Sequence, residues 1–376
     1  MSAISNKRNQ LPCITDVTDL SGKRVLLRAS LNAPIDNGAI LDALRLEKTL
    51  PTLDYLVGEG AEVIVIGHHS DNDQSLFPMY EWLNAHTSYD MAFAHNIFSA
   101  TRDHQVIVTE NIRTNPGETA NEPLFAERFA DLAELYVQDD FTVAHREHAS
   151  VVGIPKHLPT YAGIQFAHEY EQLSQALDAP HPSMLIVGGA KFESKIPLAL
   201  QFLDKVDHVF VSGAIGNPFL KARGLEVGKS KVSDDTYGLE RYLDHQGLIM
   251  PVDAIVTNDK GDVTTKKVED VQPNEVIVDP GPETVAQIVA LIADTQFVLW
   301  GGPLGYYENG FTEATDTVAR AIAESGATSI IGGGDIDATL HALGLRDKFT
   351  FISTAGGATM DFLLNGTLPG IEAIRK

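Results

Sequence analysis

Short runs of β-branched and other apolar residues alternate along this chain with longer amphipathic segments, and this alternation is the feature that most constrains the fold. It is typical of βα units whose strands form parallel sheets. In the first half the runs lie at residues 24–28, 63–67, 106–110 and 135–139. In the second half they lie at residues 184–188, 208–213, 253–257, 276–279, 297–301, 329–333 and 349–354. The pattern predicts an α/β protein built on doubly wound parallel sheets.

The pattern of apolar and polar residues changes near residues 160–182, and this change divides the chain. Residues 166–177 have the pattern of a polar helix, and a proline-marked break follows at residues 179–183. The 376 residues suffice for two domains of the usual size, about 150 residues each. The predicted parts are an N-terminal domain over residues 1–165, an interdomain helix and linker over 166–182, and a C-terminal domain over 183–360.

The composition argues against several classes of partner. Lysine and arginine number 28 against 51 aspartates and glutamates, and the formal net charge of −23 repels nucleic acids and anionic membranes. No stretch approaches the roughly 18 apolar residues of a membrane span, and residues 1–10 lack the apolar segment of a secretory signal. The single cysteine, Cys13, cannot form an internal disulfide, which fits a reducing cytoplasm. We expect a cytoplasmic protein that holds any anionic substrate with a local cluster of positive residues.

Glycine-rich turns end several predicted strands of the second half, and a helix can begin directly after each of them. Gly188 to Lys191 follow one strand, and Lys195 comes four residues after Lys191. On a helix this spacing places both ammonium groups on one face, where they could hold a polyphosphate. The same residues also fit an ordinary strand-to-helix turn with two solvated lysines, and the sequence leaves both interpretations open.

Two further turns of this kind are Gly332 to Asp335 and Gly356 to Gly357. Glycine lets backbone amides approach a ligand closely, and the Asp335 carboxylate could hold Mg²⁺ between phosphate oxygens. An aspartate that caps a helix is the alternative. The segment Trp300 to Gly305, with Glu308, could line a purine or ribose pocket, although the spacing alone favours a tight turn followed by a solvated glutamate.

Other nucleotide and metal motifs are not found in the sequence. Only three residues separate Gly224 from Gly228, whereas a Walker loop needs four residues between its glycines. No G-x-G-x-x-G fingerprint follows a predicted strand, which argues against a dinucleotide dehydrogenase. The histidines and carboxylates have no zinc-ligand spacing.

Basic and amide side chains follow the predicted strands of the first half, at Asn32, Arg45, His68, Arg113 and Arg146. Converging arginines suit a bidentate grip on carboxylate and phosphate, although each residue taken singly fits a surface or salt-bridge position. Ligands of open α/β sheets bind at the carboxyl ends of the strands. We therefore predict that one domain binds a small anion and the other binds the phosphates of a nucleotide.

A series of motifs resembles the phosphoglycerate kinase family, in the family's order and over nearly the whole chain. The first half contributes GKRVLLRASLNAP (22–34), ENIR (110–113), NPGE (115–118), AHREHASVVGIP (144–155) and LPTYAG (158–163). The second half contributes GGAKFESK (188–195), residues 300–308, GGGD (332–335) and residues 352–359. The resemblance implies that family's fold, in which two Rossmann-like domains are joined by a hinge helix and residues 361–376 return to the N-terminal domain.

The resemblance also implies an activity. Family members are hinge-bending kinases, expected as monomers, that bind 3-phosphoglycerate on the N-terminal domain and Mg-nucleotide on the C-terminal domain. They transfer a phosphoryl group reversibly between ATP and the carboxylate of 3-phosphoglycerate, with 1,3-bisphosphoglycerate and ADP as the products, in glycolysis and gluconeogenesis. ATP or ADP and Mg²⁺ are therefore the expected cofactors.

Positions in the family's motifs imply the roles of individual residues. The catalytic positions are matched by Arg45, Lys191, Gly334 and Gly357. The acceptor-binding positions are matched by Ser30, Asn32, Arg45, His68, Arg113 and Arg146. The nucleotide-binding positions are matched by Gly189, Ala190, Lys191, Lys195, Gly213, Gly302, Pro303, Glu308, Gly333, Gly334 and Asp335, and Asp335 is also linked to Mg²⁺.

Several residues depart from the family pattern. Ser30 stands where the family has an aspartate that accepts hydrogen bonds from substrate hydroxyls, and Asp71 replaces a phosphate-binding arginine. The second exchange changes the charge by two units beside an anion, which could cost several kcal/mol. Ile336 removes a hydroxyl on the nucleotide side. His69 could compensate for the lost arginine if protonated, but we expect it only to fill space.

Three hypotheses follow from the sequence. The leading hypothesis is an active phosphoglycerate kinase. The second, motivated by Ser30 and Asp71, is a kinase of the same fold that acts on a different carboxylic acid. The third, motivated by the altered glycine motifs, is a non-catalytic nucleotide-binding paralogue or scaffold. The joint retention of Arg45, Lys191, Lys195 and Asp335 speaks against the third hypothesis.

Overall fold

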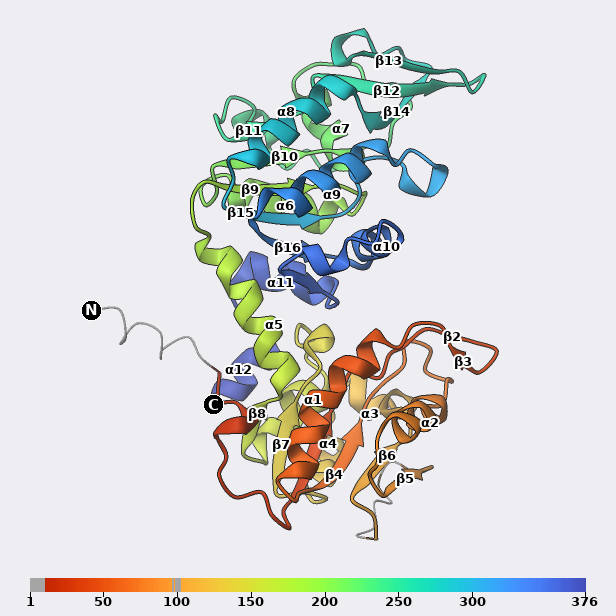
Figure 1. Ribbon diagram of the computed structural model, residues 1–376, viewed down its shortest axis with the longest axis vertical. Coiled ribbons are helices and arrows are strands. Elements are labelled where there is room, and N and C mark those ends of the chain that lie inside the picture. The colour runs from red at the N-terminus through yellow and green to blue at the C-terminus, as the bar shows by residue number, and fades with distance from the viewer. Residues whose placement is uncertain (1–10, 97, 99–102) are drawn as a thin grey trace, which may run out of the picture. The chain divides into compact units, whose positions relative to one another are not determined.

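The computed structural model describes residues 11–96, 98 and 103–376, apart from the side chains of residues 334 and 335. The chain forms two compact units. The first contains the chain up to Glu171 together with Thr367–Lys376, and the second is Gln172–Gly366. In Figure 1 the first unit runs from red to yellow-green and includes the blue helix α12, and the second runs from green to blue. The division falls inside helix α5 (Ile164–Gln175).

The first unit is built on a parallel six-stranded sheet with the order β5-β6-β4-β1-β7-β8. Its strands are β1 (Arg24–Arg28), β4 (Glu62–Ile66), β5 (Met91–Ala94), β6 (Val106–Thr109), β7 (Leu135–Gln138) and β8 (Thr160–Ala162). Strands β4 to β6 lie on one side of β1, and the chain then returns to add β7 and β8 on the other side. The carboxyl end of β1 is therefore a topological switch point, the usual position of a ligand site in such sheets.

Helices cover both faces of this sheet. They are α1 (Leu44–Gly58), α2 (Phe77–His86), α3 (Pro116–Thr119), α4 (Pro123–Ala130), the start of α5, and α12 (Pro369–Arg375), and a small hairpin is formed by β2 (Ile35–Asp36) and β3 (Ala39–Ile40). Successive side chains of a strand point to opposite faces. Accordingly, Val25 and Leu27 of β1 join the core that includes Leu53 of α1, whereas Leu26 joins a second core with Phe129 of α4.

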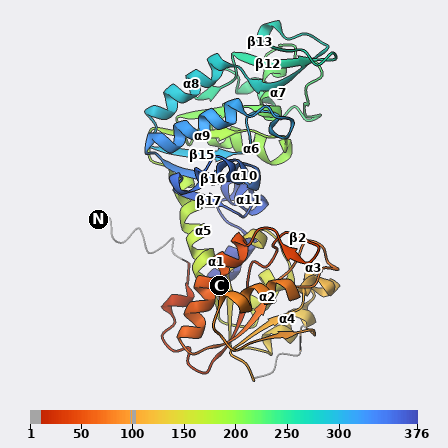
Figure 2. The same cartoon turned by 45° about the vertical axis from the view of Figure 1, so that its right-hand side comes forward.

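The second unit contains another parallel six-stranded sheet, with the order β11-β10-β9-β15-β16-β17. Its strands are β9 (Ser183–Val187), β10 (His208–Val211), β11 (Leu248–Ile249), β15 (Phe297–Gly301), β16 (Thr328–Gly332) and β17 (Phe351–Ser353). Its helices are α6 (Phe192–Phe202), α7 (Gly213–Ala222), α8 (Pro282–Ala293), α9 (Glu313–Ser325), α10 (Gly334–Ala342) and α11 (Gly357–Asn365). Helices α8 and α9 pack side by side (Figures 1 and 2). The switch point of this sheet lies at the carboxyl end of β9.

A separate antiparallel sheet corrects one prediction from the sequence. Strands β12 (Asp253–Asn258) and β14 (Glu275–Pro280) were predicted as parallel βα strands, but with β13 (Val263–Lys267) they form an antiparallel sheet in the order β13-β12-β14. A tight turn at Asn258 and Gly261, which has φ +83°, reverses the chain. Strand β13 is largely exposed and carries Thr and Lys residues, so it lacks the apolar run that would reveal it in the sequence.

The C-terminal helix α12 belongs to the first unit. The backbone N–H of Gly370 donates to the carbonyl of Ala144 at 2.8 Å, and Arg375 Nη2 donates to the hydroxyl of Tyr170 at 2.8 Å. Glycine permits this approach, because a Cβ at position 370 would lie 3.1 Å from the Ala144 Cα. Within the described ranges, no helix has the length and apolar character needed to cross a membrane.

Candidate active site

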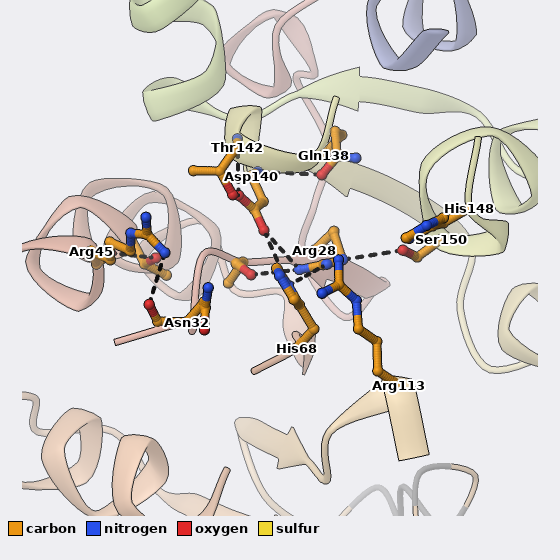
Figure 3. Close-up of polar contacts among 12 residues, drawn as sticks. Arg28, Asn32, Arg45, His68, Arg113, Gln138, Asp140, Thr142, His148 and Ser150 are labelled. Carbon is orange, nitrogen blue, oxygen red and sulfur yellow. Dashed lines mark hydrogen bonds and ion pairs between the residues drawn. The ribbon is translucent and has the colours of Figure 1, made fainter. Parts of the chain in front are cut away.

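Arg28 lies at the centre of the candidate site in the first unit, at the carboxyl end of β1 (Figure 3). Its side chain is fully buried. Nη1 donates to Asp140 Oδ2 at 3.0 Å and to the Ala29 carbonyl at 2.8 Å. Nε donates to Ser150 Oγ at 3.2 Å, and Nη2 lies 2.9 Å from His68 Nδ1. The guanidinium group therefore binds the surrounding loops together from inside the protein.

Two buried carboxylates surround this arginine. Asp140 Oδ1 accepts from the backbone N–H of Thr142 at 3.1 Å and from its hydroxyl at 2.5 Å. Glu118 accepts from the backbone N–H of Ser150 at 2.9 Å and from its hydroxyl at 2.6 Å. The Ser150 hydroxyl therefore links Arg28 to Glu118. Reasoning from the sequence did not select these residues, although Asp140 lies two residues after the end of β7, and position near a strand end was the available signal.

The pKa values of two histidines in the site are lowered by burial and by the positive charges around them. Burial is the largest cause that lowers the pKa of His68 well below its ordinary value, and the charges of Arg28, Arg113 and Arg45 lower it further. Burial likewise lowers the pKa of His148 to about 4, with Arg113 and Arg146 as the next causes. Both histidines are therefore neutral at physiological pH. A field that disfavours imidazolium favours an anionic ligand.

The predicted acceptor-binding residues lie around this field. Arg45 of α1 donates from Nη1 to the carbonyl of Asn32 at 2.8 Å (Figure 3). Asn32 Oδ1 accepts from the backbone N–H of Ser70 at 2.9 Å. Arg113 lies in the short helix η3 (Ile112–Thr114), and Arg146 is exposed. The structure thus brings the predicted basic residues and the amide together in the first unit: Asn32, Arg45, His68, Arg113 and Arg146.

The residues that depart from the family pattern have definite environments. The hydroxyl of Ser30 is buried, and no described residue forms a hydrogen bond with it. Asp71 is exposed, and its Oδ1 accepts from the backbone N–H of Asp73 at 3.0 Å. The backbone N–H of Asp71 in turn donates to His69 Nδ1 at 3.1 Å. This contact shows that His69 stabilises the loop through a hydrogen bond. It does not indicate that His69 supplies the positive charge of the missing arginine.

The second unit contains a cavity of about 510 Å³ at the carboxyl ends of β9, β10, β15 and β16. This volume is in the range of small-molecule and cofactor sites. The predicted residues that line it are Gly189, Ala190, Lys191, Lys195, Gly213, Gly302, Pro303, Glu308, Gly333 and Gly357. Ile336 is buried in the same wall. The surroundings of Gly334 and the side chain of Asp335 lie outside the described residues.

The two lysines of the cavity differ from the expected arrangement. Lys191 precedes helix α6 with a non-helical backbone, at φ −92° and ψ 80°, and its side chain is exposed. Lys195 is buried, and its Nζ donates to the carbonyls of Gly188 at 2.6 Å and Gly301 at 3.2 Å. The two ammonium groups therefore do not share one helix face, because the helix begins only after Lys191.

The turn after β15 requires glycine at position 302. Gly302 has φ +90°, and a Cβ there would lie 2.2 Å from Lys195 Nζ and 2.5 Å from the Gly188 carbonyl oxygen. The indole Nε1 of Trp300 donates to the Gly302 carbonyl at 3.0 Å. These contacts place the ends of β9 and β15 close together at the edge of the cavity.

Several helices begin beside the cavity. Helices α7, α10 and α11 begin at Gly213, Gly334 and Gly357, each two to four residues after a strand ends. Their first backbone N–H groups have no partners within the helix and carry partial positive charge, which suits phosphate oxygens. Across the part of the chain that the structure describes, no group of three or more His, Cys, Asp or Glu side chains could hold a metal ion. A divalent cation in this unit would therefore be bound mainly by nucleotide phosphates.

Comparison with known proteins gives consistent matches. The family model described as phosphoglycerate kinase matches residues 14–366. Phosphoglycerate kinase from Xanthobacter flavus is 36% identical over 391 residues, which cover 96% of this chain and 98% of that protein. The enzyme from Acaryochloris marina is 38% identical over 386 residues, covering 95% of this chain and 96% of that protein.

Solved structures agree with these matches. Phosphoglycerate kinase from Coxiella burnetii superposes with a TM-score of 0.89 at 34% identity, covering 97% of this chain and 99% of that chain. The enzyme from Pyrococcus horikoshii shares the fold, with a TM-score of 0.80 at 24% identity and coverage of 97% and 98%.

The class of the protein is defined by these matches together with its two α/β units, one with a cluster of arginines and one with a cavity of about 510 Å³. It is a phosphotransferase with a carboxyl group as acceptor. This chain belongs to the phosphoglycerate kinase family. The family, the fold class and the kinase function predicted from the sequence are confirmed.

Proposed function

We propose that this protein transfers a phosphoryl group reversibly between ATP and the carboxylate of 3-phosphoglycerate, with 1,3-bisphosphoglycerate and ADP as products, in glycolysis and gluconeogenesis. The observation that carries the proposal is the positive field of the first unit: burial is the largest cause that lowers the pKa of His68 and His148, and the charges of the surrounding arginines lower it further. Such a field attracts an acceptor that carries a phosphate and a carboxylate.

On the acceptor side, Arg45 contacts the substrate carboxylate and the transferring phosphoryl group. Asn32, His68, Arg113 and Arg146 bind the remainder of the acceptor. Arginine supports these roles because its planar guanidinium matches carboxylate and phosphate oxygens in bidentate geometry. The Ser30 hydroxyl, buried and without a partner among the described residues, is available to a substrate hydroxyl.

On the nucleotide side, Lys191 and the helix N-termini at Gly334 and Gly357 stabilise charge on the transferring group. Glu308 binds the ribose. Lys195 acts through the turn that it holds at Gly188 and Gly301. When Mg²⁺ is bound with the nucleotide, it neutralises phosphate charge, and the Asp335 carboxylate is the protein group that would hold it.

The chemistry requires little covalent participation by the protein. A carboxylate oxygen of the acceptor forms a bond to the γ-phosphorus while the bond from that phosphorus to the bridging oxygen breaks, and the electron pair leaves with ADP. The acceptor is already ionised, so no general base is needed. Positioning and charge stabilisation supply most of the acceleration. The proposal includes a hinge-bending motion that excludes water from the reacting groups. It also includes that the protein is a monomer in the cytoplasm.

The choice of acceptor is tested with a small series of acids. Turnover with Mg-ATP is compared for 3-phosphoglycerate, for 3-phosphopropionate, which lacks the hydroxyl, and for glycerate, which lacks the phosphate. We expect 3-phosphoglycerate to give the highest kcat/KM. A preference for an acid without phosphate would instead support a kinase of this fold with a different acceptor, as Ser30 and Asp71 suggest.

A further inference from the structure

The contact between Arg28 and His68 fixes the hydrogen-bonding state of the histidine. Arg28 Nη2 lies 2.9 Å from His68 Nδ1, and both side chains are buried. A guanidinium group has five N–H donors and no acceptor. The hydrogen bond therefore runs from Arg28 to the lone pair of Nδ1, and Nδ1 carries no proton.

Burial, together with the charged groups that face His68, holds the ring in its neutral form. The charged groups on the neighbouring elements are Arg28 of β1, Arg45 of α1, Arg113 of η3 and Asp140, and His148 is the neighbouring titratable ring. Three of these four charges are positive. The one carboxylate, Asp140, has Oδ2 3.7 Å from Nδ1, beyond hydrogen-bond distance, and this oxygen accepts from Arg28 instead.

A neutral ring without a proton on Nδ1 carries its proton on Nε2. Among residues 11–96, 98 and 103–376, no hydrogen-bond partner of His68 Nε2 is found. The Nε and Nη1 groups of Arg28 donate within the protein, to Ser150, Ala29 and Asp140. The Nε2–H group is therefore available to a ligand that binds among the arginines around His68.

We propose that Arg28 is a positioning residue that locks His68 in the neutral Nε2–H tautomer, so that His68 serves as an uncharged hydrogen-bond donor to an anionic oxygen of the acceptor substrate. The part that concerns the acceptor rests on the proposed function. The positive charge comes from Arg45, Arg113 and Arg146. The N–H of His68 donates a directional hydrogen bond that orients the acceptor. Binding through His68 then does not depend on its protonation between pH 6 and 8.

The tautomer is tested first in the free protein, without substrate. Long-range proton–nitrogen correlation spectra of protein labelled with ¹⁵N-histidine distinguish a protonated from an unprotonated Nδ1, and the His68→Gln variant assigns the signal among the 13 histidines. We expect an unprotonated Nδ1 and a protonated Nε2 from pH 6 to 8. A proton on Nδ1, or titration of the ring within that range, would overturn the proposal.

Two variants separate the roles of the two ring nitrogens. Asn at position 68 keeps an acceptor near the Nδ1 position for Arg28, and Gln keeps a donor near the Nε2 position for the substrate. His68→Gln loses the contact with Arg28 and should therefore raise the KM for 3-phosphoglycerate about fivefold, as Arg28→Lys does, and lower the unfolding midpoint. His68→Asn should raise the KM at least tenfold and lower the unfolding midpoint less than His68→Gln does. We expect kcat to change little in either variant. Equal KM values, or a lower KM for His68→Asn, would contradict the proposal.

The role of Arg28 itself is tested with Arg28→Lys, which keeps the charge but cannot donate to His68, Asp140 and Ser150 together. We expect both neutral tautomers of His68 in its spectrum and a KM raised at least fivefold while kcat stays within threefold. If the spectrum of Arg28→Lys still shows only the Nε2–H tautomer of His68, Arg28 does not fix the tautomer and the proposal is wrong. His69→Asn, which preserves an acceptor for the backbone N–H of Asp71, is the matched control and should leave KM unchanged.

The spectra also separate the two proposals. If the protein fails to phosphorylate 3-phosphoglycerate while free His68 is still the locked Nε2–H tautomer, the proposed acceptor is wrong and the positioning role of Arg28 is retained. If turnover is normal and His68 is protonated on Nδ1, the positioning role fails alone.

Discussion

The ammonium group of Lys195 donates a hydrogen bond of 2.6 Å to the backbone carbonyl of Gly188. A second bond, of 3.2 Å, runs to the carbonyl of Gly301, so one cation joins the ends of the neighbouring strands β9 and β15. Lys191, four residues earlier, is exposed and lines the cavity. The two lysines of one motif therefore have different tasks, Lys195 in the turn and Lys191 toward the ligand.

Substitution of each lysine should separate these tasks. Lys191→Ala should lower kcat at least tenfold, in line with the loss of one electrostatic stabiliser, and leave the urea unfolding midpoint unchanged because the side chain is exposed. Lys195→Met removes the donor to the Gly188 carbonyl, which costs about 1–3 kcal/mol of stability, whereas the Gly301 carbonyl still accepts from the backbone N–H of Gly188 at 2.9 Å. It should lower both the midpoint and kcat. Unchanged turnover in Lys191→Ala would remove that residue from the mechanism, and a parental midpoint in Lys195→Met would remove the structural role.

The glycine at position 302 should be required for nucleotide binding. In Gly302→Ala the new Cβ meets the Gly188 carbonyl oxygen at 2.5 Å and Lys195 Nζ at 2.2 Å, so the edge of the cavity has to move. We expect the Kd for ADP, measured by calorimetry, to rise at least tenfold. Gly261→Ala is the matched control, since Gly261 has a similar φ of +83° but no atom within 4 Å of the new Cβ. Equal effects in the two variants would show that backbone strain, and not the contact, is responsible.

The charge at Asp71 should weaken acceptor binding. Asp71→Asn keeps an oxygen for the backbone N–H of Asp73 and removes the negative charge, and Asp71→Arg reverses the charge. We expect the KM for 3-phosphoglycerate to fall in the order parent, Asp71→Asn, Asp71→Arg. Because Asp71 is exposed, the differences should shrink at high salt. A KM that does not change in either variant would dismiss the charge as a determinant.

The buried carboxyl of Asp139 should make stability depend on pH. Its Oδ1 accepts from the backbone N–H of Phe166 at 3.0 Å at the start of α5, and burial raises its pKa from 3.8 to about 7. The folded protein thus holds this proton more tightly than the unfolded chain does, so the stabilisation present below pH 4 is lost as the pH rises through 7.

Asp139→Asn removes this titration. The free energy of unfolding of the parent, minus that of the variant, should decrease between pH 5 and pH 8 by about 3 kcal/mol, because each pH unit between 5 and the folded pKa of about 7 contributes about 1.4 kcal/mol. Taking the difference cancels the contribution of the histidines. Urea titrations at several pH values measure it, and a difference that stays constant or grows with pH would contradict the assignment.

The sequence predicted much of the fold because buried parallel strands appear as continuous apolar runs. The runs at 24–28 and 297–301 coincide with β1 and β15. Strand β13 was missed because an exposed edge strand carries no such run, and the antiparallel direction of β12 and β14 depends on that missing strand. Pairing partners are a property of the folded chain, and a single strand does not specify them.

The sequence also indicated part of the candidate site, as it did part of the fold. Position after a strand end selected His68 and Arg113, since parallel strands bring their carboxyl ends together. The internal partners could not be read in the same way. Arg28 and Ser150 lie 122 residues apart in sequence, and Lys195 and Gly301 lie 106 apart. Such contacts depend on tertiary packing, so the buried roles of Arg28 and Lys195 emerge only from the structure.

The most direct test of the central claim measures ADP formation by the purified protein with Mg-ATP and 3-phosphoglycerate, while a coupling enzyme removes 1,3-bisphosphoglycerate because the forward equilibrium is unfavourable. We predict turnover that saturates with both substrates and is lost when either is omitted. No turnover, in a preparation that calorimetry shows to bind Mg-ATP, would contradict the claim that this chain phosphorylates 3-phosphoglycerate.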